Sequence, residues 1–167
     1  MVWNIISALV ENKPGVLFRV SNMFRSRNFN IESLSVGPTE QSDLSRITVT
    51  IDTEEHVIEQ IVKQLRKLID IVDVTQLTID NTVYRELALL KLKVDDSDSR
   101  IEIINLTNIF RGKVVDNSKG SIMIELTGKP DKIDAFWSLV EHYGVIQLAR
   151  TGVSALPRGA IYERRIC

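Results

Sequence analysis

The residues best placed to do chemistry in this sequence form a short polar turn, Asn12-Lys13-Pro14-Gly15-Val16-Leu17, that leads into a predicted helix. The first amides of a helix have no carbonyl acceptor within it, and the helix dipole makes this end positive, so such a turn can hold a small carboxylate. Gly15 allows a ligand close approach, and Asn12 can both donate and accept hydrogen bonds. The same pattern is found in ordinary strand-to-helix turns, and the local sequence leaves both interpretations open.

No pattern of catalytic residues accompanies this turn. The two histidines, His56 and His142, have neither metal-ligand nor nucleophile spacing, and the sequence contains no P-loop and no GxGxxG motif. Asp95, Asp96 and Asp98 lack the loop glycine and the terminal glutamate of a calcium site, so we interpret them as a solvated turn with a helix cap. We therefore predict no catalytic residue, no metal site and no enzymatic activity for the chain on its own.

The composition is that of a globular protein that can bury a core. Of 167 residues, 44% are hydrophobic and 26% are charged, and the formal net charge is -1. Basic residues are scattered except for Arg158, Arg164 and Arg165, for which we favour a solvated tail over a docking contact. The single cysteine, Cys167, cannot form a disulfide within one chain. No apolar run approaches the roughly 20 residues of a membrane span, and the first residues do not resemble a signal peptide. We expect a cytoplasmic protein that binds neither nucleic acid nor a membrane.

Hydrophobic periodicity predicts the order strand, helix, strand, strand, helix, strand in the first half of the chain. Asn28 is expected to end the first helix in the left-handed conformation, and Thr53 is expected to cap the second. Apolar side chains share one face of each helix: Val16, Val20, Met23 and Phe24 in the first, and Ile58, Ile61, Leu65 and Leu68 in the second. The predicted strands cover residues 2–10, 30–36, 46–51 and 71–79.

The second half repeats this order, with a junction near residues 80–83. Asp98 is a possible cap for a helix that carries Ile101, Ile104 and Phe110 on one face. Pro130 opens a second helix, whose apolar face comprises Ile133, Phe136, Trp137 and Val140. The predicted strands cover residues 84–94, 113–115, 121–127 and 144–149, with a hairpin turn at 117–120.

This repeated order is typical of the ferredoxin-like arrangement, so we predict an α+β protein of two tandem βαββαβ domains. Each would have an antiparallel four-stranded sheet with two helices on one face. We assign residues 1–80 to the first domain and residues 81–167 to the second, with an irregular tail from about residue 151. Right-handed crossovers place the strand at residues 30–36 at an edge of the first sheet. Because an exposed edge can pair with another chain, we expect a homodimer.

Several motifs, in order, resemble the small regulatory subunits of acetohydroxyacid synthase, also called acetolactate synthase. The first half is similar to the ACT domain of that family in residues 11–20, 29–36 and 44–48, and the second half is similar in residues 85–87, 109–116 and 149–153. The resemblance covers essentially the whole chain. One departure is Asn28, which stands where the family often has glycine.

The resemblance implies a non-catalytic subunit that activates a separate catalytic subunit and confers feedback inhibition by valine in valine, leucine and isoleucine biosynthesis. It implies no cofactor in this chain, whereas thiamine diphosphate, FAD and magnesium are expected on the catalytic subunit. The effector would lie at the interface of an ACT dimer. By this resemblance it would be contacted by Asn12, Gly15, Val16 and Leu17 of one chain and by Asn30 and Ile31 of the other.

Two other functions are considered from the sequence. An ACT-type module can regulate a different enzyme or a transcription complex, because a fold does not determine a function. A small hydrolase on the same fold is disfavoured, since the sequence offers no nucleophile–base pair. The sequence does not predict which of valine, leucine and isoleucine is the effector, because one methylene changes binding by only about 1–3 kcal/mol. It also does not predict the stoichiometry or the surface that contacts the catalytic subunit.

Overall fold

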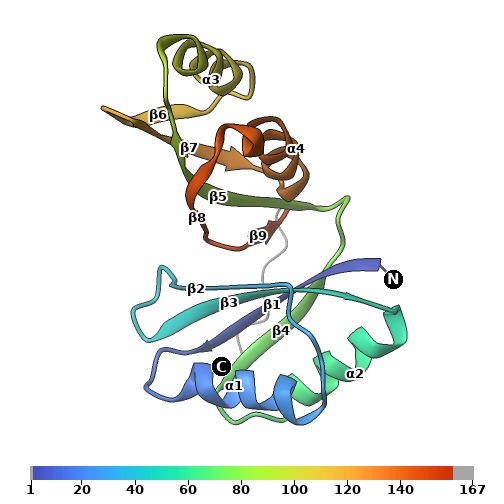
Figure 1. The fold of residues 1–167 in the computed structure, drawn as a ribbon. Coiled ribbons are helices and arrows are strands. Elements are labelled where there is room, and N and C mark those ends of the chain that lie inside the picture. The colour runs from blue at the N-terminus through green and yellow to red at the C-terminus, as the bar shows by residue number, and fades with distance from the viewer. Residues whose placement is uncertain (1, 160–167) are drawn as a thin grey trace. The chain divides into compact units, whose positions relative to one another are not determined.

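The computed structural model describes residues 2–159, which form two compact units (Figure 1). Among the described residues, unit 1 comprises residues 2–84 together with residues 153–159, and unit 2 comprises Arg85–Gly152. The return of the chain to unit 1 differs from the predicted irregular tail of the second domain. Arg164, Arg165 and Cys167, for which a solvated tail was expected, lie outside the described residues.

Unit 1 contains the predicted four strands and two helices in the predicted order. They are β1 (Val2–Glu11), α1 (Val16–Ser26), β2 (Ser33–Pro38), β3 (Leu44–Thr53), α2 (Glu55–Leu65) and β4 (Ile71–Leu77). The antiparallel sheet has the order β2-β3-β1-β4, so the prediction that the second strand lies at an edge is confirmed. Both helices cover the same face of this sheet (Figure 1).

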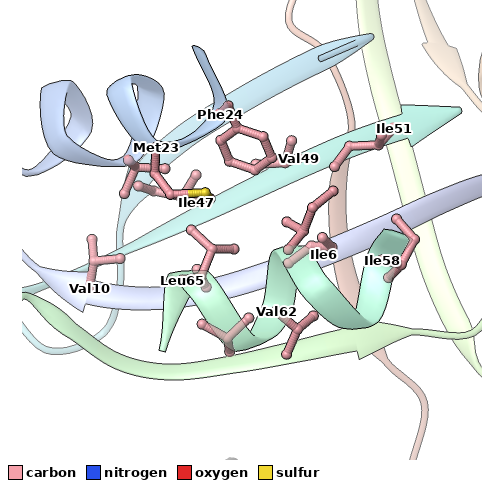
Figure 2. Packing of buried hydrophobic residues seen from close by; sticks show 14 of the residues in the cluster. Ile6, Val10, Met23, Phe24, Ile47, Val49, Ile51, Ile58, Val62 and Leu65 are labelled. Carbon is pink, nitrogen blue, oxygen red and sulfur yellow. The ribbon is translucent and has the colours of Figure 1, made fainter. Parts of the chain in front are cut away.

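The core of unit 1 lies between this face and the two helices. Because side chains alternate along a strand, every second residue of β1 and β3 points beneath the helices. Figure 2 shows Met23 and Phe24 of α1 directed toward Ile47 and Val49 of β3. Phe24 is only 1% exposed, and the apolar face predicted for α1 is therefore the buried one.

The helix ends agree only in part with the sequence-based expectations. Asn28 follows α1 with φ 56°, the left-handed conformation predicted for it. The prediction that Thr53 caps α2 was wrong, because Thr53 still pairs with Val2 as the last residue of β3, and Glu54 precedes the helix without a side-chain cap. The prediction for Asp98 was also wrong: the Asp96 carboxylate accepts a 2.7 Å hydrogen bond from the Ser99 amide and caps α3 (Ser97–Ile109).

Unit 2 repeats the topology of unit 1. After β5 (Thr82–Lys93) and α3, the chain forms β6 (Lys113–Ser118), β7 (Ser121–Gly128), α4 (Pro130–Val140), the 3₁₀ helix η1 (Glu141–Tyr143) and β8 (Val145–Arg150). The strand order is β6-β7-β5-β8, which corresponds to that of unit 1. The stripe predicted for α3 was wrong at Ile101, which is 57% exposed, because the face that packs on the sheet carries Ile103 and Thr107 instead.

A further strand, β9 (Ser154–Pro157), pairs with β5 and was not predicted. Val153 and Ala155 pack against Ile5 in a small apolar cluster that also includes Leu77 and Tyr84. Ile5 alternates with Ile6 of the main core, so this cluster lies on the face of the first sheet that α1 and α2 leave open. The returning segment therefore keeps Ile5 fully buried.

None of the helices within residues 2–159 has the length and apolar character needed to cross a bilayer.

Candidate functional site

The turn before α1 is shaped by Gly15. This glycine precedes the helix in the left-handed conformation, with φ 86° and ψ -8°, and its carbonyl accepts the first helical hydrogen bond from the Arg19 amide at 3.1 Å. A Cβ atom at this position would lie 3.2 Å from Nη1 of Arg19. Glycine is therefore the residue that fits here without strain, and its lack of a side chain leaves room for a ligand at the helix start, where the Val16 amide itself donates to the Lys13 carbonyl at 3.4 Å.

Asn12 fastens this turn to the β2–β3 turn. Its amide donates to the Asp43 carbonyl at 2.7 Å, and its side-chain Nδ2 donates to the Ser42 carbonyl at 3.2 Å. Two hydrogen bonds to neighbouring residues restrict how the loop can move relative to the end of β2. The structure thus gives Asn12 a positioning role that the sequence did not predict.

The two hydrophobic candidates in the turn differ in exposure. Val16 is only 4% exposed and belongs to the core, so its side chain is not available to a ligand on the surface. Leu17 is 43% exposed and Phe18 is 72% exposed. Phe18 was not predicted as a site residue, although its position off the buried stripe of the helix indicates exposure. An apolar ligand group at this end of α1 would meet Leu17 and Phe18 rather than Val16.

Two ion pairs lie beside the turn. Arg19 binds the Asp70 carboxylate through both Nε, at 2.5 Å, and Nη2, at 2.7 Å, and these hydrogen bonds lower the pKa of Asp70. Lys13 contacts Glu11 at 2.8 Å, and this contact raises the pKa of Lys13. Because Lys13 and Arg19 each already pair with a carboxylate, an added anion at the turn would be attracted mainly by the helix amides and dipole.

Asn30 and Ile31 lie at the other end of the sheet within the same chain. They precede the start of β2, where Ser33 is opposite Thr50, whereas the turn at residues 12–15 follows Glu11, which is opposite Leu44. The eleven residues of α1 connect the two ends, and at 1.5 Å per residue this corresponds to roughly 16 Å. The structure therefore does not bring the two predicted groups of effector residues together in one chain.

Asn30 and Ile31 differ in how far their side chains are exposed. The Asn30 side chain is exposed and donates to Oε1 of Glu32 at 2.9 Å. Ile31 is partly buried and packs against the core of unit 1. A ligand that reached this end of the sheet would meet a polar amide next to an anchored apolar side chain.

The histidines and acidic residues of the described part of the chain do not form a metal site. Within residues 2–159, no three His, Cys, Asp or Glu side chains gather as a metal site would require. His56 contacts Glu54 at 3.2 Å on the surface, and His142 stacks on Tyr143 with ring centroids 4.0 Å apart.

The chain has two tandem ferredoxin-like units, and the first combines a helix that starts at a glycine with a nearby edge strand. These features are typical of the ACT-domain class of proteins. Residues 6–73 match the family model for the AHAS small subunit-like ACT domain, and residues 85–159 match the model for the small subunit of acetolactate synthase. The chain belongs to the family of acetolactate synthase small subunits.

Relatives cover almost the whole chain. The acetolactate synthase small subunit of Mycolicibacterium smegmatis is 49% identical over 154 residues, which are 92% of this chain and 90% of that protein. The small subunit of Aquifex aeolicus is 45% identical over 155 residues, or 93% and 81% of the two chains. The crystal structure of the Thermotoga maritima small subunit superposes with a TM-score of 0.89 at 40% identity, covering 96% of this chain and all of that one (100%).

These similarities confirm the fold predicted from the element order and the resemblance to the family. Membership of the family implies a regulatory subunit that works with a catalytic subunit in branched-chain amino acid biosynthesis.

Proposed function

We propose that this chain activates the catalytic subunit of acetolactate synthase and makes that subunit sensitive to valine. The observation that carries the proposal is the glycine-initiated N-terminus of α1, fastened by Asn12 to the turn that follows β2. This helix start would offer a carboxylate site close to the end of the edge strand β2. The thiamine diphosphate, FAD and magnesium of the reaction would be held by the catalytic subunit, and both subunits would act in the cytoplasm.

The effector site would be completed by a second copy of the chain. In an antiparallel pair of β2 strands related by a two-fold axis, the start of each strand lies beside the end of the other. Asn30 and Ile31 of the partner subunit would then approach the turn at residues 12–17. This arrangement joins two groups of residues that lie at opposite ends of the sheet in one chain, and it covers the edge of β2.

A branched-chain amino acid suits the surfaces that would meet there. The open amides of the first helical turn can bind its carboxylate, and the exposed Leu17 side chain can contact its aliphatic group from one side. Ile31 of the partner subunit would contact the aliphatic group from the other side. The side-chain oxygens of Asn12 and of Asn30 of the partner subunit would be available to the ammonium group.

Inhibition would follow from a preference of valine for one arrangement of the dimer. A ligand shifts a conformational equilibrium only by its difference in affinity for the two states, typically about 1–3 kcal/mol. The second unit would pass this change to the catalytic subunit.

The test is reconstitution with the cognate catalytic subunit. Acetolactate formation is measured with and without the chain, and valine, leucine and isoleucine are then titrated into the complex and, by calorimetry, into the chain alone. We expect activation, inhibition by valine, and a dimer in sedimentation experiments. A chain that stays monomeric and neither activates the enzyme nor binds any of the three amino acids would refute the proposal, and selective capture of another enzyme would favour a different regulatory role.

A further inference from the structure

The segment that returns from unit 2 is hydrogen-bonded to the edge strand of unit 1. This return segment, residues 153–157, belongs to unit 1 and contains β9. The Val153 amide donates to Oγ of Ser33 at 3.4 Å, and Oγ of Ser154 shares a 3.2 Å hydrogen bond with Oγ of Ser35. Both serine partners, Ser33 and Ser35, lie on β2. The return segment is therefore bonded to the strand through which we propose that the dimer forms.

Apolar packing holds the same segment on the open face of the first sheet. Val153 is 2% exposed and Ala155 is 5% exposed, and both pack in the cluster around Ile5. Ile5 is opposite Thr50, which is opposite Ser33, so these three residues form one row across the sheet and point to the same face. Oγ of Ser33 also shares a 2.7 Å hydrogen bond with Oγ1 of Thr50. The return segment thus contacts this row at Ser33 and at Ile5.

The return segment adjoins both chain connections to unit 2. The chain enters unit 2 along β5, whose first residues belong to unit 1, and it leaves unit 2 at Gly152, directly before the segment. Strand β9 pairs with β5, and beyond it the Arg158 amide donates to the Asn81 carbonyl at 2.6 Å. A displacement of the segment would therefore act on the strand that enters unit 2 and on the chain that leaves it.

The segment also has room to shift. A hollow of about 390 Å³ is lined by Gly37 and Thr48 of the first sheet and by Ser154 and Leu156 of the return segment. The main core of unit 1 lies on the other face of this sheet, beneath α1 and α2. The segment can consequently change position without repacking that core.

The residues proposed to contact the effector lie next to these hydrogen bonds. Asn30 and Ile31 precede Ser33 by three and two residues along the chain. An effector that contacts them and prefers one position of the start of β2 would move Ser33, and Ser33 would carry the change to the Val153 amide. The effector shifts the segment only as far as its affinities for the two positions differ.

We propose that the return segment couples the effector site to unit 2. An amino acid bound beside the start of β2 moves the segment through Ser33 and Ser35, and the segment passes this change to unit 2. The proposal rests on the function proposed above and adds the element by which unit 1 acts on unit 2. Ser35, Val153 and Ser154 are then positioning residues for regulation, and they act through the segment rather than by contact with the effector.

The test separates valine binding from valine inhibition. Ser35→Ala/Ser154→Ala removes the hydroxyl bridge, and Val153→Ala removes two buried methyl groups from the segment. The matched control is Ser118→Ala/Ser138→Ala, because these hydroxyl groups form hydrogen bonds within unit 2. Melting temperature and calorimetric titration of valine are measured for each isolated chain. The reconstituted complex with the catalytic subunit then gives activation and the inhibition at saturating valine.

We expect every variant to activate the enzyme and to bind valine within about threefold of the affinity of the unsubstituted chain. The inhibition at saturating valine should fall by at least about half in Ser35→Ala/Ser154→Ala and in Val153→Ala, and stay unchanged in the control. Ser154→Thr keeps the hydroxyl group and should retain the inhibition. A merely structural role would lower the melting temperature and leave the inhibition as it is.

Full inhibition in both return-segment variants would overturn the coupling role and leave the proposed function intact. A loss of valine affinity large enough to account for the lost inhibition would assign these residues to the effector site, and it would also overturn the proposal. If the unsubstituted chain neither binds valine nor confers inhibition, the proposed function is rejected, and the coupling role is rejected with it.

Discussion

Replacing Gly15 tests the carboxylate site most directly. Gly15→Asp adds a negative charge beside the first amides of α1, and Gly15→Asn adds a side chain of nearly the same shape without the charge. Asp and Asn are the residues other than glycine that best tolerate the left-handed conformation observed here, φ 86°. Both variants should therefore fold, and each should lose about 1 kcal/mol of stability through backbone strain.

The charge effect follows from the geometry of the turn. An aspartate carboxylate at residue 15 would lie about 5 Å from an anion bound at the helix amides, and two such charges repel by about 1–3 kcal/mol for effective dielectric constants between 80 and 20. Arg19, whose Nη1 lies 3.2 Å from the position of a Cβ at residue 15, offsets part of this repulsion. We therefore expect valine to bind Gly15→Asp about tenfold more weakly than Gly15→Asn.

The assay is calorimetric titration of valine into each variant, together with activation of the catalytic subunit and its inhibition by valine. Activation should persist in both variants, because the substitution lies in the proposed effector site, which is separate from the second unit. If Gly15→Asp and Gly15→Asn bound valine with equal affinity, the effector carboxylate would not lie at the start of α1, and the reasoning from the helix amides would be wrong.

Three further predictions concern assembly and stability. Val36→Lys places a charge on the edge strand β2 and should weaken the dimer in sedimentation equilibrium, whereas Val83→Lys, at a valine of similar exposure, should not; equal weakening would contradict pairing through β2. The pKa of Asp70 lies below its ordinary value of 3.8 because its arginine partner stabilises the carboxylate, so this stabilisation is present above that pH and is lost as the pH falls through the lower, folded pKa. Asp70→Asn should therefore lower the melting temperature at neutral pH and reduce the decrease in melting temperature on acidification. If the melting temperatures of the variant and the unsubstituted chain changed in parallel with pH, the ionised Asp70 carboxylate would not stabilise the fold. Arg150→Met leaves the buried Glu86 carboxylate without its cation and should lower the free energy of unfolding by about 3 kcal/mol, measured by denaturant. Asp134→Asn, at the exposed contact of Arg150, should lower it by less than about 1 kcal/mol. Similar losses would show that the buried pair is not the stronger interaction.

Much of the fold could be predicted because the information is local. The helical spacing of Val20 and Phe24 is enough to identify the buried face of α1, and Asn28 marks the end of that helix. The prediction failed where tertiary contacts decide: Ile101 follows the apolar pattern of α3 but faces solvent, and Thr53 stays in β3 because it pairs with Val2. Strand β9 was missed since its partner lies about 70 residues earlier in the chain.

The candidate site was less accessible to sequence reasoning. The glycine of the turn at residues 12–17 and its position before a helix made it a candidate carboxylate site, with an ordinary strand-to-helix turn as the alternative, whereas Asn30 and Ile31 were named only through the family resemblance. No local pattern connects them to the turn, because they lie at the other end of the sheet and would meet it only in a second copy. The burial of Val16 and the exposure of Phe18 required the packed structure.

The return of the chain to unit 1 makes that unit discontinuous, with unit 2 inserted between its two parts. A deletion series from the C-terminus would consequently damage the N-terminal unit first: removing everything after Gly152 leaves unit 2 whole but strips Val153 and Ala155 from Ile5. Loss of amino-acid sensitivity in such a truncation would then report a disturbed ACT unit, and assigning it to the second half of the chain would be a mapping error. Excision of residues 85–152 with a short connecting linker is the cut that follows the actual boundaries.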